Sequence, residues 1–178
     1  GVPGGGGGGV VTGFFGGLSG GGGWAPGLSG RPPSFLQAPG PVNRIVGWAQ
    51  FAGFLRTLGK EVDGGEGLEE LGELICEMKP ARAIQSLAGF TASPFYLYRA
   101  ASRWALRRAL PGVESSIEQV AQHDIVIRAR VADTLRACPQ LFHIATGRAR
   151  ALPRLLGLPD AVARPQIGAR EAASPTTV

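Results

Sequence analysis

Glycine is concentrated at the start of this chain and restricts where a folded core can form. About half of the first thirty residues are glycine, including the run from Gly4 to Gly9. A segment of this kind buries too little apolar surface to offset the entropy that it loses on ordering. We therefore expect residues 1–40 to be a flexible Gly/Pro-rich arm, with the core between about Pro41 and Pro159.

Charge is divided unevenly along the 178 residues, although the net value is only +5. Residues 60–79 contain two Lys against seven acidic residues, a local charge of −5, whereas residues 93–178 contain twelve Arg against six acidic residues, a local charge of +6. A basic half of this kind suits an acidic protein, nucleic acid or an anionic membrane surface. The acidic segment could instead face a basic neighbour or the chain's own Arg-rich half.

Apolar residues recur at spacings of three and four in segments separated by Pro and Gly, which predicts helices throughout. In the segment 67–79 the leucines face inward and Glu69, Glu70, Glu73 and Glu77 face outward. Ser115-Ser116-Ile117-Glu118 has the form of a capping box and predicts the start of a long helix. Pro153 should truncate or kink the last helix. The predicted helices cover residues 44–58, 67–79, 81–90, 94–110, 116–137 and 140–156.

Catalytic and metal-binding patterns are absent from the sequence. Cys76 and Cys138 lie far apart without a CxxC pair, and they are expected to be reduced, buried thiols. His123 and His143 are expected to have structural roles. The glycine run lacks the Lys and the flanking strand and helix of a phosphate loop. We predict that the protein is not an enzyme and holds no metal.

The predicted helix over 94–110 combines an apolar stripe with a basic one. Ser93 can cap it and Pro94 suits its first position. Its apolar side carries Leu97, Ala101, Trp104 and Ala105, and its basic side carries Arg99, Arg103 and Arg107. The helix could bury one side against its own chain and hold an acidic partner with the other, although a merely solvated basic face gives the same pattern.

Three stretches of this Arg-rich half resemble the LYR-motif family of small mitochondrial proteins. They are Leu97-Tyr98-Arg99 with Arg103, then Ile127-Arg128-Ala129-Arg130-Val131, and finally Leu141 to Arg148 followed by Leu152. The resemblance covers about residues 93–157 and implies an all-α, LYR-type three-helix bundle. In one departure, Val131 stands where the family usually has an aromatic residue.

The resemblance also implies a function. Family members bind mitochondrial acyl carrier protein, whose acyl-phosphopantetheine inserts between the helices, so no cofactor would be bound directly. The chain would be a non-catalytic accessory subunit of an inner-membrane respiratory complex, most simply complex I (NADH:ubiquinone oxidoreductase), contacting other subunits on the matrix side. Arginine suits this contact because it forms bidentate bonds to carboxylates. The implied partner-binding residues are Leu97, Tyr98, Arg99, Arg103, Arg107, Arg128 and Arg130.

The expected organisation has four parts: a flexible arm (1–40), a helical extension (41–92), a LYR-like three-helix domain (93–157) and a C-terminal tail (158–178). Three alternatives remain open, with no role for DNA in any of them. One is a mitochondrial ribosome-associated LYR protein whose basic surface faces rRNA. The second is a direct RNA-binding protein, although the basic helices lack exposed aromatic residues for base stacking. The third is a membrane-surface protein anchored by residues 44–58, which are too short to span a bilayer.

Overall fold

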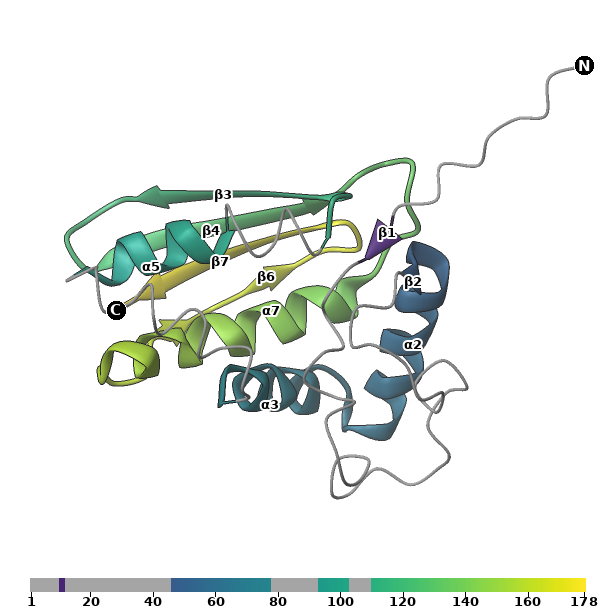
Figure 1. Ribbon diagram of the computed structural model, residues 1–178, viewed down its shortest axis with the longest axis horizontal. Coiled ribbons are helices and arrows are strands. Elements are labelled where there is room, and N and C mark those ends of the chain that lie inside the picture. The colour runs from purple at the N-terminus through teal and green to yellow at the C-terminus, as the bar shows by residue number, and fades with distance from the viewer. Residues whose placement is uncertain (1–9, 12–45, 78–92, 103–109) are drawn as a thin grey trace, which may run out of the picture.

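Helices and strands are both present in this chain. The structure, a computed structural model, describes residues 10–11, 46–77, 93–102 and 110–178. Its helices are α2 (Trp48–Glu61), α3 (Gly64–Glu77), α5 (Pro94–Ala100) and α7 (Pro139–Ala151), the last continued by the 3-10 helix η2 (Leu152–Leu156). Its strands are β1 (Val10–Val11), β2 (Val46–Gly47), β3 (Val113–Gln119), β4 (Asp124–Val131), β5 (Val162–Ala163), β6 (Gln166–Ile167) and β7 (Glu171–Thr177). The predicted all-α fold is therefore wrong (Figure 1).

Helices α2 and α3 confirm that the segments 44–58 and 67–79 are helical, with shifted bounds. The predicted faces of the second segment are only partly right, because Leu74 was expected inside and is 53% exposed, and Glu69 was expected outside and is buried. The chain turns between them through Asp63 and Gly64, whose φ angles are 46° and 69°. Glycine adopts this left-handed conformation without strain, and Asp tolerates it better than most residues. The helix predicted over 81–90 lies outside the described residues.

Strands β3 and β4 occupy the segment that was predicted to be a helix over 116–137. They form an antiparallel hairpin in which Ile117 faces Ile127. Burial alternates along β4, where Ile125 is buried and Arg128 is exposed. Ser115, from the supposed capping box, instead shares a hydroxyl hydrogen bond of 2.5 Å with Ser102. The helix prediction is wrong because the same β-branched residues also fit the two-residue period of a half-buried strand.

Strand β7 pairs with the other edge of β4 and continues the sheet. Both β5 and β6 pair with β7 in one register, so they are two parts of a single edge strand. Between them the N–H of Arg164 donates to the carbonyl of Pro175 at 3.0 Å. Pro175 has no N–H to complete the ladder, which accounts for the gap between β5 and β6. The segment 158–178, expected to be a tail, thus contains three strands.

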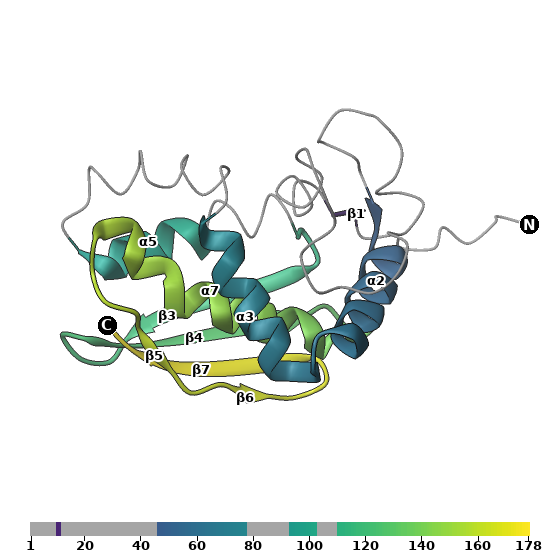
Figure 2. The same cartoon turned by 90° about the horizontal axis from the view of Figure 1, so that it is seen from below.

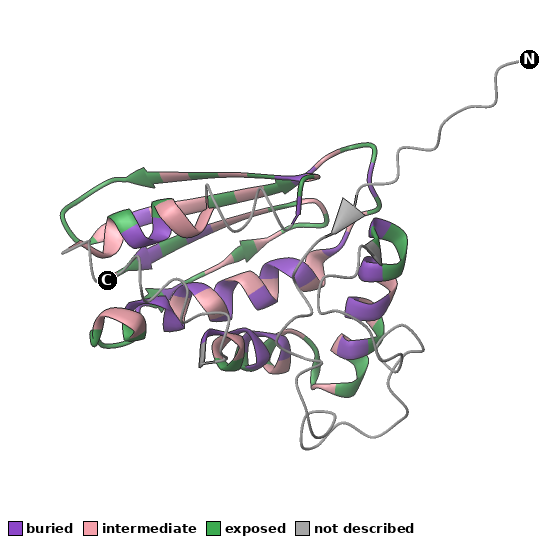
Figure 3. Cartoon of the chain, in the orientation of Figure 1, coloured by how far each residue is buried: buried purple, intermediate pink, exposed green. Residues whose placement is uncertain are grey.

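The described helices α3, α5 and α7 lie on one side of the sheet (Figures 1 and 2). Two hydrophobic clusters hold these layers together, and Figure 3 shows buried residues concentrated along α7 and α2. The larger joins α2, α3 and α7 to the sheet and includes Phe51, Leu55, Val131 and Phe142. The smaller lies under α5 and includes Leu97, Tyr98, Ile125 and Leu152. Among the described helices, none is long and apolar enough to cross a bilayer.

The LYR-type three-helix bundle expected over 93–157 is not formed, because β3 and β4 stand where its second helix was placed. The effect expected of Pro153 is confirmed, since α7 ends at Ala151 and the chain continues as a 3-10 helix. Without an N–H, Pro153 cannot bond to the carbonyl of Ala149, four residues before it. The hydroxyl of Tyr98 donates to that carbonyl instead, at 2.6 Å. The tyrosine of the LYR-like segment therefore stabilises the end of α7 from within the core.

Candidate functional site

The approach of α3 to α7 depends on glycines at their contact. A Cβ atom at Gly147 of α7 would overlap the backbone carbonyl of Glu69, and one at Gly72 of α3 would overlap the carbonyl of Ile144. A Cβ at Gly65 would press on the ring of His143. These glycines let the two helix backbones come close together, which places Glu69 of α3 within reach of side chains on α7.

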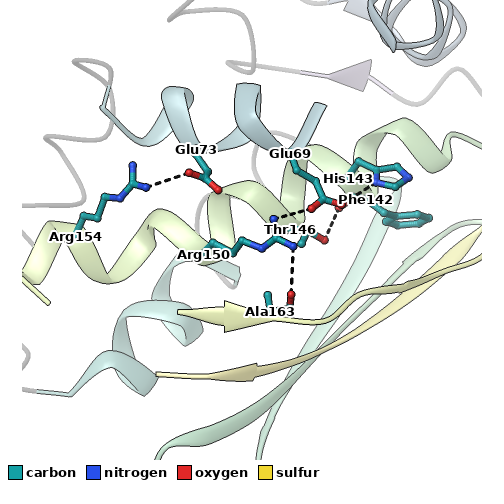
Figure 4. Close-up of polar contacts among 8 residues, drawn as sticks. All are labelled: Glu69, Glu73, Phe142, His143, Thr146, Arg150, Arg154 and Ala163. Atoms are coloured by element: carbon teal, nitrogen blue, oxygen red, sulfur yellow. Dashed lines mark hydrogen bonds and ion pairs between the residues drawn. The ribbon is translucent and has the colours of Figure 1, made fainter. Parts of the chain in front are cut away.

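A buried carboxylate lies at this crossing (Figure 4). The side chain of Glu69 is 12% exposed, and each of its oxygens has a partner on α7. Its Oε1 lies 3.0 Å from Nδ1 of His143, and its Oε2 lies 2.8 Å from Nη1 of Arg150. Arg150 also donates from Nη2 to the carbonyl of Ala163 at 3.3 Å. The cluster thereby joins α3, α7 and β5.

A second ion pair lies one turn further along both helices. Arg154 of η2 contacts Glu73 of α3 at 3.0 Å and binds Asp160 through two hydrogen bonds of 2.5 and 2.6 Å. The hydrogen bond from Arg154 holds the pKa of the Asp160 carboxyl below its usual value. The same bond is the main cause of the raised pKa of Arg154. Because this site is largely open to water, we expect it to stabilise the fold less than the buried cluster.

The buried cluster stabilises the contact between α3 and α7. Arg150 balances the charge of the Glu69 carboxylate, and the pair is buried enough that losing one partner would leave a costly charge. The hydroxyl of Thr146 donates to the carbonyl of Phe142 at 3.0 Å, so it is already committed within α7. In the parts of the chain that the structure describes, no group of three or more His, Cys, Asp and Glu is arranged to hold a metal ion.

The five predicted partner-binding residues that the structure describes do not lie on one surface. Leu97 and Tyr98 are buried, and Arg99 is exposed on α5, which packs on the side of the sheet that carries Ile125 and Ile127. Side chains alternate along a strand, so Arg128 and Arg130 of β4 point to the opposite side. There they contact Glu118 at 2.7 Å and Asp133 at 2.9 Å. Arg103 and Arg107 lie outside the described residues.

Sequence reasoning missed the central residue of the buried cluster, because Glu69 was placed on an outward face of its helix. The available signal was the segregation of charge. Glu69 and Glu73 are four apart on the acidic helix, as Arg150 and Arg154 are in the Arg-rich half, and the ion pairs join them in matching order. The acidic face does meet the chain's own Arg-rich half, one of the two arrangements that its charge predicted.

Comparison with known proteins gives a fold and no family. No family model matches the sequence, and no curated protein matches it. The structure is similar to that of an Fe(II) unliganded H-NOX protein from K. algicida, with a TM-score of 0.56 and 10% sequence identity over 83% of this chain and 80% of that one. A mutant of the same H-NOX protein gives a TM-score of 0.55 and 11% identity over the same shares. The likeness at this identity concerns the fold alone.

These findings overturn the LYR assignment and everything that followed from it. A fold with a β-sheet, shared with an H-NOX protein, is not a LYR bundle, so the assignment to a complex I accessory subunit is wrong. The expected insertion of an acyl-phosphopantetheine also loses its basis, because it required a three-helix bundle whose second helix is replaced by β3 and β4.

The described residues do not fit an iron site like that of the neighbour. An iron ligand such as His, Cys or Tyr must direct its donor atom toward the metal. His123 is exposed at the turn of the β3–β4 hairpin. His143 lies against Gly65 with Nδ1 at Glu69, and the hydroxyl of Tyr98 is bound to a carbonyl. The two buried thiols do not suit an iron ligand either. Cys76 donates to a carbonyl at 3.5 Å, and burial raises the pKa of Cys138, which disfavours the metal-binding thiolate.

Proposed function

We propose that this protein is a non-catalytic binding module whose α/β domain presents the exposed face of its sheet to another protein. The support comes from where the polar side chains are used. Glu69, His143 and Arg150 fasten helices to the sheet, and Tyr98 completes the end of α7. Arg170 donates to two carbonyls of the loop after β4, at 2.7 and 3.1 Å. These contacts give each group a role in the fold, which supports a binding role rather than a catalytic one.

The observation that carries the proposal is the outer sheet face, the side of the sheet turned away from α5 and α7. None of its side chains is buried, and several are apolar. Val120 and Val162 are 58% and 59% exposed, and Pro175 is exposed beside Val126. Exposed apolar side chains flanked by charges are typical of protein contact sites. The outer sheet face consists of Glu114, Ser116, Glu118, Val120, Asp124, Val126, Arg128, Arg130, Val162, Arg164, Gln166, Glu171, Ala173, Pro175 and Thr177.

The charge of the outer sheet face favours protein over nucleic acid as its partner. The face carries four acidic residues against three arginines, whereas a surface that follows phosphates is strongly basic. The RNA-binding alternative therefore draws no support from this face, despite the net charge of +5. The expectations that the protein is not an enzyme and that it resides in mitochondria stay predictions, and the second rested on the LYR resemblance.

Site-specific photo-crosslinking in the cells of origin tests the proposal. A photoreactive amino acid replaces Gln166 on the outer sheet face, and in a matched control it replaces Glu70, which is exposed on α3. We expect adducts from position 166 that contain an identified protein, resist nuclease and are absent at position 70. Equal labelling at both positions, or adducts that nuclease removes, would contradict the proposal.

A further inference from the structure

We infer that the protein partner of the outer sheet face is a second copy of this chain, related by a twofold axis that runs parallel to the strands between β4 and β7. This inference rests on the proposed function, because it names the partner for the same face. Its basis is the register of the sheet, which places the side chains of the outer sheet face in four rows across the strands.

The rows follow from the pairing of β4 with β3 and β7, and of β7 with the edge strand made of β5 and β6. From β3 to the edge strand, the four rows read Glu114–Arg130–Glu171, Ser116–Arg128–Ala173–Gln166, Glu118–Val126–Pro175–Arg164 and Val120–Asp124–Thr177–Val162. Arg164 belongs to the third row because its N–H donates to the carbonyl of Pro175, and Val120 belongs to the fourth because its N–H donates to the carbonyl of Asp124 at 2.9 Å.

A twofold axis in this position exchanges the order of the strands while keeping each row opposite itself. Glu118 then faces the partner's Arg164, and Arg130 faces the partner's Glu171. Val126 faces the partner's Pro175, and Val120 faces the partner's Val162. In these four contacts opposite charges meet and apolar side chains meet apolar ones, which is the self-complementarity that an isologous interface requires of a single surface. Of the other charged residues in the two central strands, Arg128 faces the partner's Ala173 and Asp124 faces the partner's Thr177. Each of these contacts occurs twice.

The size of the surface indicates a weak dimer. Four strands about 4.8 Å apart, with seven residues each rising about 3.4 Å, cover roughly 450 Å² per copy. A stable complex buries about 800 Å² per partner. Twist also tilts two packed sheets by about 30°, so that the central rows approach most closely. We therefore expect a transient dimer held mainly by the third row, where Val126 and the charged ends meet.

Sedimentation velocity of the purified full chain over a wide concentration range tests this inference. We expect a concentration-dependent dimer. Arg164→Glu puts a carboxylate opposite the partner's Glu118 at two equivalent places, and it should raise the dissociation constant by about tenfold or more. Arg136→Glu is the matched control, because it makes the same change in net charge at a residue that is exposed outside the outer sheet face. It should leave the dissociation constant unchanged.

Charge exchange distinguishes a direct contact from a general electrostatic effect. The double variant Glu118→Arg with Arg164→Glu restores opposite charges across the interface and also removes the Glu118–Arg128 ion pair within each chain, so we expect it to recover part of the lost association. A chain that stays monomeric at every concentration, or an Arg164→Glu variant that associates like Arg136→Glu, would overturn the inference. If the chain is monomeric and crosslinking from position 166 captures a different protein, the binding function stands and the dimer does not.

Discussion

The hydrogen bond from Tyr98 to Ala149 makes a quantitative prediction about stability. Its 2.6 Å length and the 3% exposure of Tyr98 place it in the core, and the acceptor is a carbonyl that Pro153 leaves without a helical donor. Tyr98→Phe keeps the ring and removes the hydroxyl, so a buried carbonyl loses its partner. A buried acceptor left without a partner costs about 1–3 kcal/mol. We expect the free energy of unfolding to fall by that amount.

Urea unfolding followed by circular dichroism measures this loss as a lower midpoint at constant slope. Tyr96→Phe provides the matched control, because Tyr96 is two residues away and 57% exposed. Its effect should lie within about 0.5 kcal/mol.

A double-mutant cycle then tests the proposed cause. Pro153→Ala supplies an N–H that can reach the Ala149 carbonyl, so in that background Tyr98→Phe should cost about 1 kcal/mol less. Equal effects of Tyr98→Phe and Tyr96→Phe, or a cycle without coupling, would refute the reasoning.

Three further predictions concern the helix crossing and the buried phenol. Glu69→Gln leaves Arg150 without its carboxylate. Because Arg150 is 31% exposed, we expect the free energy of unfolding, measured by thermal unfolding, to fall by about 1–3 kcal/mol. The exposed control Glu70→Gln should change it very little. Gly147→Ala forces a Cβ into the carbonyl of Glu69 and should lower the free energy of unfolding by about 1–3 kcal/mol, whereas Gly53→Ala, which has open space in α2, should raise it by up to about 1 kcal/mol. Burial chiefly raises the pKa of Tyr98 above its usual 10.0, so the phenol stays protonated in the fold while the unfolded chain ionises. The contribution of the Tyr98 phenol to the free energy of unfolding is therefore complete below pH 10.0 and declines as the pH rises further. Urea unfolding measured at several pH values above 10.0 should show a smaller decline of that free energy for Tyr98→Phe than for the unmodified chain.

The helical parts of the fold were predictable because their patterns were unambiguous. Residues 48–61 and 64–77 have one apolar side, and Pro153 stops α7 because it lacks an N–H. The hairpin was not predictable in the same way. Ile117, Val120, Ile127 and Val131 fit a helical spacing, yet Ile125, Ile127, Ala129 and Val131 also alternate. The high share of β-branched residues was the signal that favoured strands.

The C-terminal strands and the buried cluster could not be predicted from the sequence, for two different reasons. Residues 162–177 contain two prolines and few large apolar side chains, so their strand character depends on pairing. Strand β7 pairs with β4, and β5 and β6 pair with β7. For the cluster, charge segregation indicated that acidic and basic helices could meet. It could not indicate that Glu69 would be buried, since that depends on the close approach permitted by Gly72 and Gly147.

The outer sheet face and its proposed binding role depend on the register of β3 against β4, because this register places the charged and apolar side chains on the same side of the sheet. Nuclear Overhauser contacts between Hα atoms in the isotope-labelled full chain measure it directly. The hydrogen bonds Val120 to Asp124 and Ala132 to Gly112 make the even-numbered residues of β3 hydrogen-bonded pairs, so the odd-numbered pairs bring their Cα atoms closest, at about 4.5 Å. We expect strong Hα–Hα contacts between Ile117 and Ile127 and between Ser115 and Ala129. Contacts between each residue and the third one after it over 116–137, without those cross-strand contacts, would indicate a helix and contradict the account.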